Sequence, residues 1–257
     1  YLASQLDTTF DINDFLPEEL PIARDIEFMM DEFDLSGGSA PQVYILVKGD
    51  MASPATLEAM NDTVYNMQGD PDILDVGDRP DVSDITTFML SVATPPQSAA
   101  DIFSRFNATF SGMYRQYMGP DGMPLPGTGT DDIRSLYDWL FDNKPKETMR
   151  YLYRSGDGTD RDYSAAVMKI STRDMKMDDA EIEQLRQALK ADKRPLDDCP
   201  DVDESIITGG SILTSMVMTS INQSQINSMI VTTLMSALVL SIVFGYTDRS
   251  IMLGILT

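Results

Sequence analysis

The chain has 257 residues, which is enough for one large domain or two small ones. It carries 41 acidic and 19 basic residues, and this net charge of −22 argues against binding to nucleic acid or to an anionic membrane surface. No histidine occurs, which excludes His-dependent triads, Cys–His dyads and His-ligated metals from this sequence. Such a charge suits a solvated extracellular domain.

Residues 1–40 form an acidic segment that contains one predicted helix and ends in a Gly/Ser/Pro linker. Ten Asp or Glu residues stand against Arg24 in the first 34 positions. Pro21 suits the first turn of a helix. Ile22, Ile26, Met29 or Met30, and Phe33 then follow at helical spacing. This pattern predicts a surface helix that packs on a domain, and a functional acidic patch is the alternative.

Residues 41–80 have the pattern of a first β-α-β unit. Val43–Lys48 is a short apolar run typical of a buried strand. Ser53 and Pro54 are a favourable N-cap and first residue for a helix that extends to about Gln68. Ile73–Val76 is predicted as a second, weaker strand.

Residues 81–162 are predicted to be a helical insertion. The pattern of Ile85–Val92 fits a helix or a strand equally well. Helices are expected over Ala99–Tyr117, Asp131–Asn143 and Lys146–Arg154, from their apolar spacing.

The first long helix of this insertion has more large apolar side chains than one packed face requires. Aromatic and Met side chains suit a pocket that accepts varied apolar shapes. Packing on neighbouring helices is an equally good interpretation. The candidate binding residues, expected between the sheet and the insertion, are Phe103, Phe106, Phe110, Met113, Tyr114 and Tyr117, with Met118 beside them.

The loop before the next strand holds Asp157, Asp160 and Asp162. Carboxylates at alternate positions suit calcium, but the closing Glu of an EF-hand is missing, so a solvated turn is the main interpretation. Cys199 is interpreted as a small residue in a turn and not as a nucleophile. The sequence therefore predicts no catalytic residue, no metal site and no cofactor.

Residues 163–210 have the pattern of a second β-α-β unit. Strands are predicted at Ala165–Ser171 and Glu204–Ile207, with a helix over Asp178–Ala191 in which Glu183 and Arg186 pair. Two such units predict an α+β fold of the split β-α-β (ferredoxin-like) type, with four antiparallel strands and both helices on one face. The first strands of the two units should be neighbours at the centre of the sheet.

Residues 211–246 are predicted to be one long helix that enters and crosses a membrane. No Lys, Arg, Asp or Glu occurs in Ser205–Thr247, and Ile226–Tyr246 is long enough for a bilayer. The alternative is a buried core helix. Residues 247–257 are expected to be a cytoplasmic turn and the start of a next membrane helix, in a piece of a larger membrane protein. Residues 1 to about 225 would then be extracellular or periplasmic.

This order of parts resembles the resistance–nodulation–division (RND) transporter superfamily, in particular its MMPL-like branch of hydrophobe exporters. Asp14–Pro21 looks like the family's opening after its first membrane helix, and Val43–Asp50 looks like its first porter strand. Thr208 and Gly209 resemble the entry into its second membrane helix, although Gly210-Ser211 departs from the usual Thr-Gly-x-Pro.

The resemblance implies an extracellular porter domain that is not an enzyme. Its parent protein would move hydrophobic or amphiphilic, lipid-like molecules, driven by an ion gradient coupled on a later helix. The expected partners are the lipid bilayer, a hydrophobic small molecule or lipid, and the remainder of the same transporter, with a homo-oligomer as a further option and no nucleic acid. A membrane-anchored extracellular sensor or adhesion domain is the alternative function.

Overall fold

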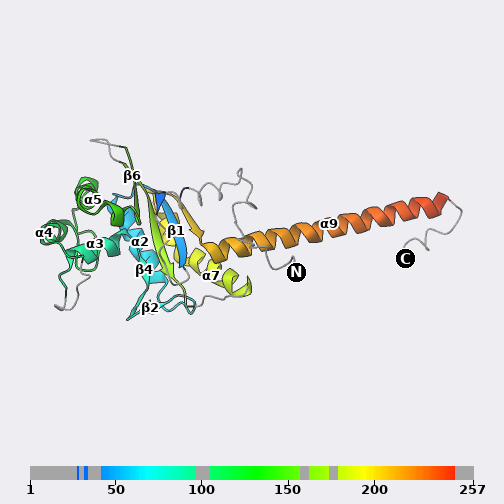
Figure 1. Cartoon of the computed structure of the whole chain (residues 1–257), viewed down its shortest axis with the longest axis horizontal. Helices are drawn as coiled ribbons and strands as arrows, with labels where there is room; N and C mark the ends of the chain where they lie inside the picture. The colour runs from blue at the N-terminus through cyan, green and yellow to red at the C-terminus, as the bar shows by residue number, and fades with distance from the viewer. Residues whose placement is uncertain are drawn as a thin grey trace, which may run out of the picture. The chain divides into compact units, whose positions relative to one another are not determined.

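The structure is a computed structural model that describes residues 28, 32–33, 42–96, 105–156, 162–173 and 179–246. The chain divides into two compact units, Tyr1–Leu213 and Thr214–Thr257. The described elements, drawn in Figure 1, are β1 (Gln42–Gly49), α2 (Pro54–Asn66), β2 (Asp75–Val76), β3 (Arg79–Pro80), β4 (Val82–Ser83), α3 (Ile85–Ala93), α4 (Ala108–Tyr117), α5 (Thr130–Asn143), α6 (Pro145–Thr148), β5 (Leu152–Ser155), β6 (Asp162–Ser171), α7 (Asp179–Asp192), α8 (Arg194–Asp198), β7 (Val202–Thr208) and α9 (Gly210–Tyr246).

The first unit is an α+β structure built on an antiparallel sheet. Its strand order is β4-β6-β1-β7, and β5 also pairs with β6. β1 lies between β6 and β7 and is antiparallel to both, with Ile45 opposite Met168 on one side and Ile207 on the other. The prediction that the two most apolar strands are neighbours is therefore confirmed, although more than 100 residues separate them in the chain.

Successive side chains along the central strands point to opposite faces of the sheet, and apolar side chains are buried on both faces. On one face Val43, Ile45 and Val47 join the large core that also holds the apolar side chains of α2 and α7. On the other face Leu46 forms a smaller cluster with Phe33 and other residues, Ala165 and Val167 among them. Since Phe33 is fully buried there, the acidic N-terminal segment contributes at least this side chain to the core.

The helix α2 begins where the sequence predicts it. The Ser53 hydroxyl accepts a hydrogen bond from the Ala55 N–H, and Pro54 occupies the first turn. The turn before it depends on Gly49, whose φ is +142°. A Cβ at this glycine would lie 2.3 Å from the carbonyl oxygen of Asp201, so no other residue fits without a shift of the backbone.

The second predicted strand, Ile73–Val76, is confirmed only in part. Ile73 forms an isolated antiparallel bridge with Thr172, and the Leu74 N–H donates to the Ser171 carbonyl at the end of β6. Asp75–Val76 pairs instead with β3 in a separate hairpin closed by Gly77 at a φ of +69°. The named strand that joins β6 here is β4, Val82–Ser83.

The region 81–162 contains helices, but strands at both ends join the sheet. α3 settles the open assignment of Ile85–Val92 as a helix. The predicted helix Lys146–Arg154 is wrong beyond α6, because β5 follows at Leu152 and pairs with β6. The predicted helix Ala99–Tyr117 is shorter than expected, since Asn107 caps α4; residues 97–104 lie outside the described residues.

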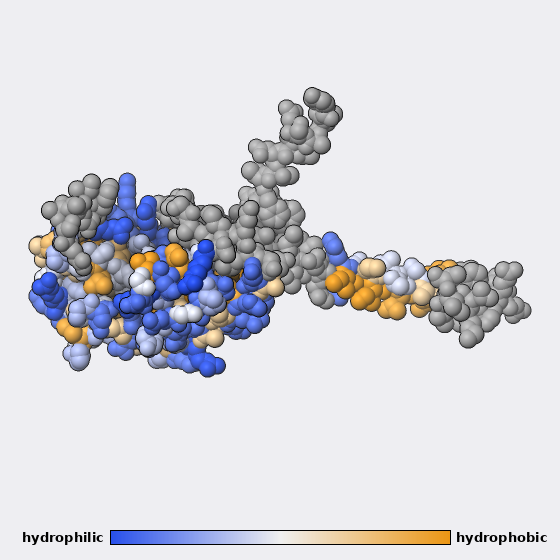
Figure 2. Space-filling view, turned by 90° about the horizontal axis from the view of Figure 1, so that it is seen from below, coloured by the Kyte–Doolittle hydropathy of each residue, from blue (hydrophilic) through white to orange (hydrophobic). Residues whose placement is uncertain are grey.

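The long C-terminal helix is confirmed as α9, which has 37 residues. Within it Ser224–Ile242 is long and apolar enough to cross a membrane, with a mean hydropathy of 1.6 and none of the stretch buried. Figure 2 shows apolar side chains on the described surface of this helix. The hydroxyls of Thr232 and Thr233 donate to the carbonyl oxygens of Ser228 and Met229, so these polar groups are satisfied within the helix.

Candidate functional site

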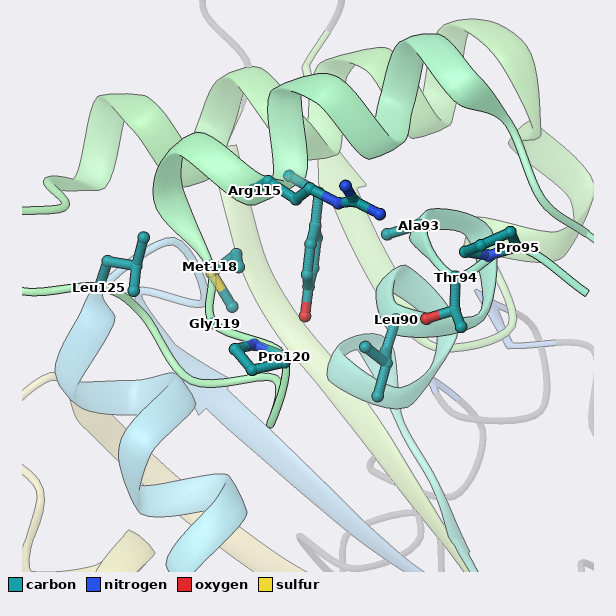
Figure 3. Close-up of a pocket in the computed structure, with 10 residues that line it drawn as sticks. Leu90, Ala93, Thr94, Pro95, Arg115, Met118, Gly119, Pro120 and Leu125 are labelled. Atoms are coloured by element: carbon teal, nitrogen blue, oxygen red, sulfur yellow. The ribbon is translucent and has the colours of Figure 1, made fainter. Parts of the chain in front are cut away.

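An apolar pocket lies in the helical part of the first unit. Its volume is about 520 Å³, which lies within the usual range for small-molecule sites. Figure 3 shows residues of α3 and the following turn on one side, and residues of the loop after α4 on the other. The lining residues are Leu90, Ala93, Thr94, Pro95, Tyr114, Arg115, Met118, Gly119, Pro120 and Leu125.

Backbone hydrogen bonds fix the two helices that form this pocket. The Asn107 N–H donates to the Val92 carbonyl at 2.9 Å, which joins the end of α3 to the start of α4. The Asn107 side chain in turn accepts from the Phe110 N–H at 3.0 Å and caps α4. The end of α3 and the start of α4 are therefore fixed to each other beside the pocket.

The loop after α4 is also tied down. The Gly119 N–H donates to the Met123 carbonyl at 2.7 Å, and the Leu125 N–H donates to the Tyr117 carbonyl at 2.8 Å. The Thr128 hydroxyl donates to the same Tyr117 carbonyl. These bonds hold Met118 and Pro120 against the pocket without help from a ligand.

Tyr114 forms part of the pocket wall and is only 2% exposed. Its hydroxyl is buried and has no hydrogen-bond partner among the described residues. Burial raises the pKa of this phenol well above its ordinary value, and the nearby Asp121 and Asp84 carboxylates raise it further. The hydroxyl therefore stays protonated and remains an unused donor beside an apolar cavity.

Arg115 is the one cationic side chain among the lining residues. It is exposed, and it makes no ion pair or hydrogen bond among the residues that the structure describes. In Figure 3 its guanidinium extends toward Ala93 across the pocket. The site thus combines apolar walls with a single positive charge.

Comparison with protein-family models, with curated proteins and with solved structures gives no match for this chain.

The structure separates the predicted binding residues into four groups. Tyr114 lines the pocket, as does Met118. Phe110 is fully buried and packs on Trp139, with ring centroids 4.9 Å apart, so it belongs to the core. Met113 and Tyr117 on α4, and Phe106 before it, are partly buried and do not line the pocket. Phe103 lies outside the described residues.

The position of the pocket also differs from the prediction. It lies between α3 and the α4 region, inside the helical part, and not between that part and the sheet. Leu90 and Ala93 on α3 were missed because the sequence left that segment unassigned. Arg115 was missed because one charged residue in an amphipathic helix has the pattern of a solvated face.

A cluster of Lys193, Asp197 and Ser205 is the best candidate for nucleophilic chemistry, and its geometry argues against that role. The Lys193 ammonium donates to the Ser205 hydroxyl at 2.8 Å and also to the Asp197 carboxylate. Burial raises the pKa of Asp197, but hydrogen bonds from Lys193 and Ser205 outweigh this and lower it. The paired ammonium has no free electron pair to activate the serine, so the cluster ties α8 to β7.

No group of three or more potential metal ligands occurs among the described residues. Of the three aspartates considered for calcium, Asp162 lies in β6, and the other two lie outside the described part of the chain. Cys199 is buried at the end of α8, as expected for a structural residue.

Proposed function

We propose that this chain is an extracytoplasmic porter domain of an RND-type, MMPL-like transporter that moves hydrophobic or amphiphilic molecules. The observation that carries the proposal is the apolar pocket, which lies in a chain whose last described helix has an exposed apolar span of 19 residues. A protein with both features has a place to hold an apolar molecule and a means of staying at the bilayer, which is the source of such molecules.

The sheet topology supports the same proposal. β1, α2 and β4 form one β-α-β unit, and β6, α7 and β7 form another. The first strands of the two units are central neighbours, and both helices contribute to the core on one face. These pairings support a split β-α-β subdomain as the finer fold, which is the one that the resemblance implies.

The site also suits binding better than chemistry. Apart from Arg115 and the Tyr114 hydroxyl, the lining offers one further polar side chain, Thr94. None of these is paired with a general base in the described structure. The energy that drives transport would come from an ion gradient coupled elsewhere in the parent protein.

The test uses vesicles that contain the whole transporter, loaded with a fluorescent hydrophobic dye and given an ion gradient. Dye should leave faster than from empty vesicles, and Ala93→Leu should slow its movement by partly filling the pocket. Thr109→Leu, which adds a similar side chain on the exposed side of α4, is the matched control. If neither dye nor lipid moves in any variant, a membrane-anchored sensor or adhesion domain becomes the better interpretation.

A further inference from the structure

The charge in the pocket narrows the kind of molecule that it accepts. The chain has 41 acidic residues, yet the lining contributes no carboxylate and one guanidinium, that of Arg115. A purely apolar ligand would gain nothing from this exposed cation, which water solvates. A ligand with a negative head group would pair with it, because the guanidinium binds carboxylates through planar, directional hydrogen bonds.

The negative charge of the whole chain limits how much negative charge the head can carry. The chain has a net charge of −22, and the lining offers one cation to offset a ligand's charge. A single negative charge is therefore favoured, which points to a carboxylate and not to a doubly ionised phosphate.

The exposure of Arg115 locates the polar end of the ligand. Arg115 is exposed in the last turn of α4, whereas the Tyr114 hydroxyl is buried and out of reach of a charged head group. The head group would therefore lie at the guanidinium, on the open side of the pocket. The remaining lining residues, Leu90, Ala93, Pro95, Met118, Pro120 and Leu125, are apolar and suit a hydrocarbon chain.

We propose that the pocket binds a single-chain amphiphile with a carboxylate head, and that Arg115 selects this head over an uncharged one. This rests on the proposed function, since it names the substrate class of the same pocket. A purely structural explanation also exists for the arginine. Arg115 lies in the last turn of α4, where a cation is stabilised by the helix dipole.

The test compares octanoate with octanol, which have the same chain length, at pH 8. The full chain is held in zwitterionic nanodiscs, and equilibrium dialysis sets the free ligand concentration. Binding is followed by NMR of ¹³C-methyl methionine, with the Met118 methyl as the site probe and the buried Met60 on α2 as the internal control. Octanoate should bind about fivefold more tightly than octanol, as expected for an exposed ion pair.

Variants assign the preference to one residue. Arg115→Gln should weaken octanoate about fivefold and leave octanol unchanged, whereas Arg194→Gln, which removes an exposed cation from α8, should change neither. Leu125→Trp at the partly exposed rim should weaken both ligands. This rim substitution keeps the test valid if changes on α4 disturb folding.

Two outcomes overturn the proposal and separate it from the proposed function. Equal affinities for octanoate and octanol, or an Arg115→Gln variant that loses stability but not octanoate selectivity, would leave an apolar site and reduce the arginine to its helix-terminal role. If neither ligand shifts the Met118 methyl, the pocket is no binding site, and the function proposed from it falls as well.

Discussion

The carboxyl groups of Asp70 and Asp192 predict a pH-dependent loss of stability. Asp192 ends α7, and Asp70 lies in the turns that follow α2; the Asn66 amide donates to the Asp192 carbonyl at 3.1 Å and links the two segments. Burial, and then the hydrogen bond with Asp70 and its charge, raise the pKa of Asp192 from 3.8 to about 7. The folded state therefore keeps the Asp192 carboxyl protonated to a higher pH than the unfolded state, which releases this proton near pH 4.

The sign follows from this difference in bound protons. Between about pH 4 and pH 7 the folded state binds more protons than the unfolded state, so the free energy of unfolding falls as pH rises. For a fully buried group, a pKa difference of this size between the folded and unfolded states would change the free energy of unfolding by about 4 kcal/mol. Because Asp192 is partly exposed, solvent screening reduces the expected effect to about 1 kcal/mol.

Asp192→Asn should remove this loss. Its amide can donate to Asp70 at every pH, so the variant should match the parent chain at pH 4.5 and exceed its stability by about 1 kcal/mol at pH 8. Urea unfolding followed by fluorescence of Trp139, the single tryptophan, reports on the first unit alone. Asp62→Asn on the exposed face of α2 makes the same change in net charge. If the two variants give the same pH profile, the carboxyl pair does not exist as described.

Four further pairs of variants test the fold and the site. Tyr114→Phe should stabilise the protein by up to about 1 kcal/mol, because it removes an unpaired buried hydroxyl. Tyr137→Phe should destabilise it by about 1 kcal/mol, because the Tyr137 hydroxyl donates to the Met51 carbonyl at 2.9 Å. Urea unfolding measures both, and a loss of stability in Tyr114→Phe would indicate that the Tyr114 hydroxyl has a partner. Gly49→Ala should cost more than about 2 kcal/mol in thermal unfolding because of its 2.3 Å contact, and Gly69→Ala, with nothing within 4 Å, should cost clearly less. Leu234→Lys in the middle of the apolar span should move the chain out of the membrane fraction, since a central lysine costs about 3 kcal/mol, while Gln225→Lys at its edge should not. In a Cys199→Ser background, a cysteine at position 250 should resist impermeant thiol reagents in intact cells and one at the exposed Asp131 should react; the reverse would invert the proposed orientation.

The sequence predicts those parts of the fold that have a strong period or a long apolar run. β1 and β6 are apolar over most of their length, so their position at the centre of the sheet and their pairing follow from the apolar composition of the two strands. α9 is recognised because a charge-free run of this length has few other stable forms. These elements are determined by their own residues, which is why local pattern is enough.

The elements that were missed depend on contacts far along the chain. β4 has two residues, Val82 and Ser83, and no period can be read from two residues. Its place in the sheet is set by neighbours, including the hydrogen bond from the Ser171 N–H to the Asp81 carbonyl. β5 was missed for a similar reason, since its four residues become a strand only because β6 offers an edge.

The pocket shows why a run of aromatic residues is a poor guide to a cavity. Large rings bury much apolar area and so are stabilised most where neighbours surround them. Phe110 satisfies this against Trp139 and is fully buried. Open space remains instead where small or rigid side chains face each other, as Ala93, Thr94 and Gly119 do here.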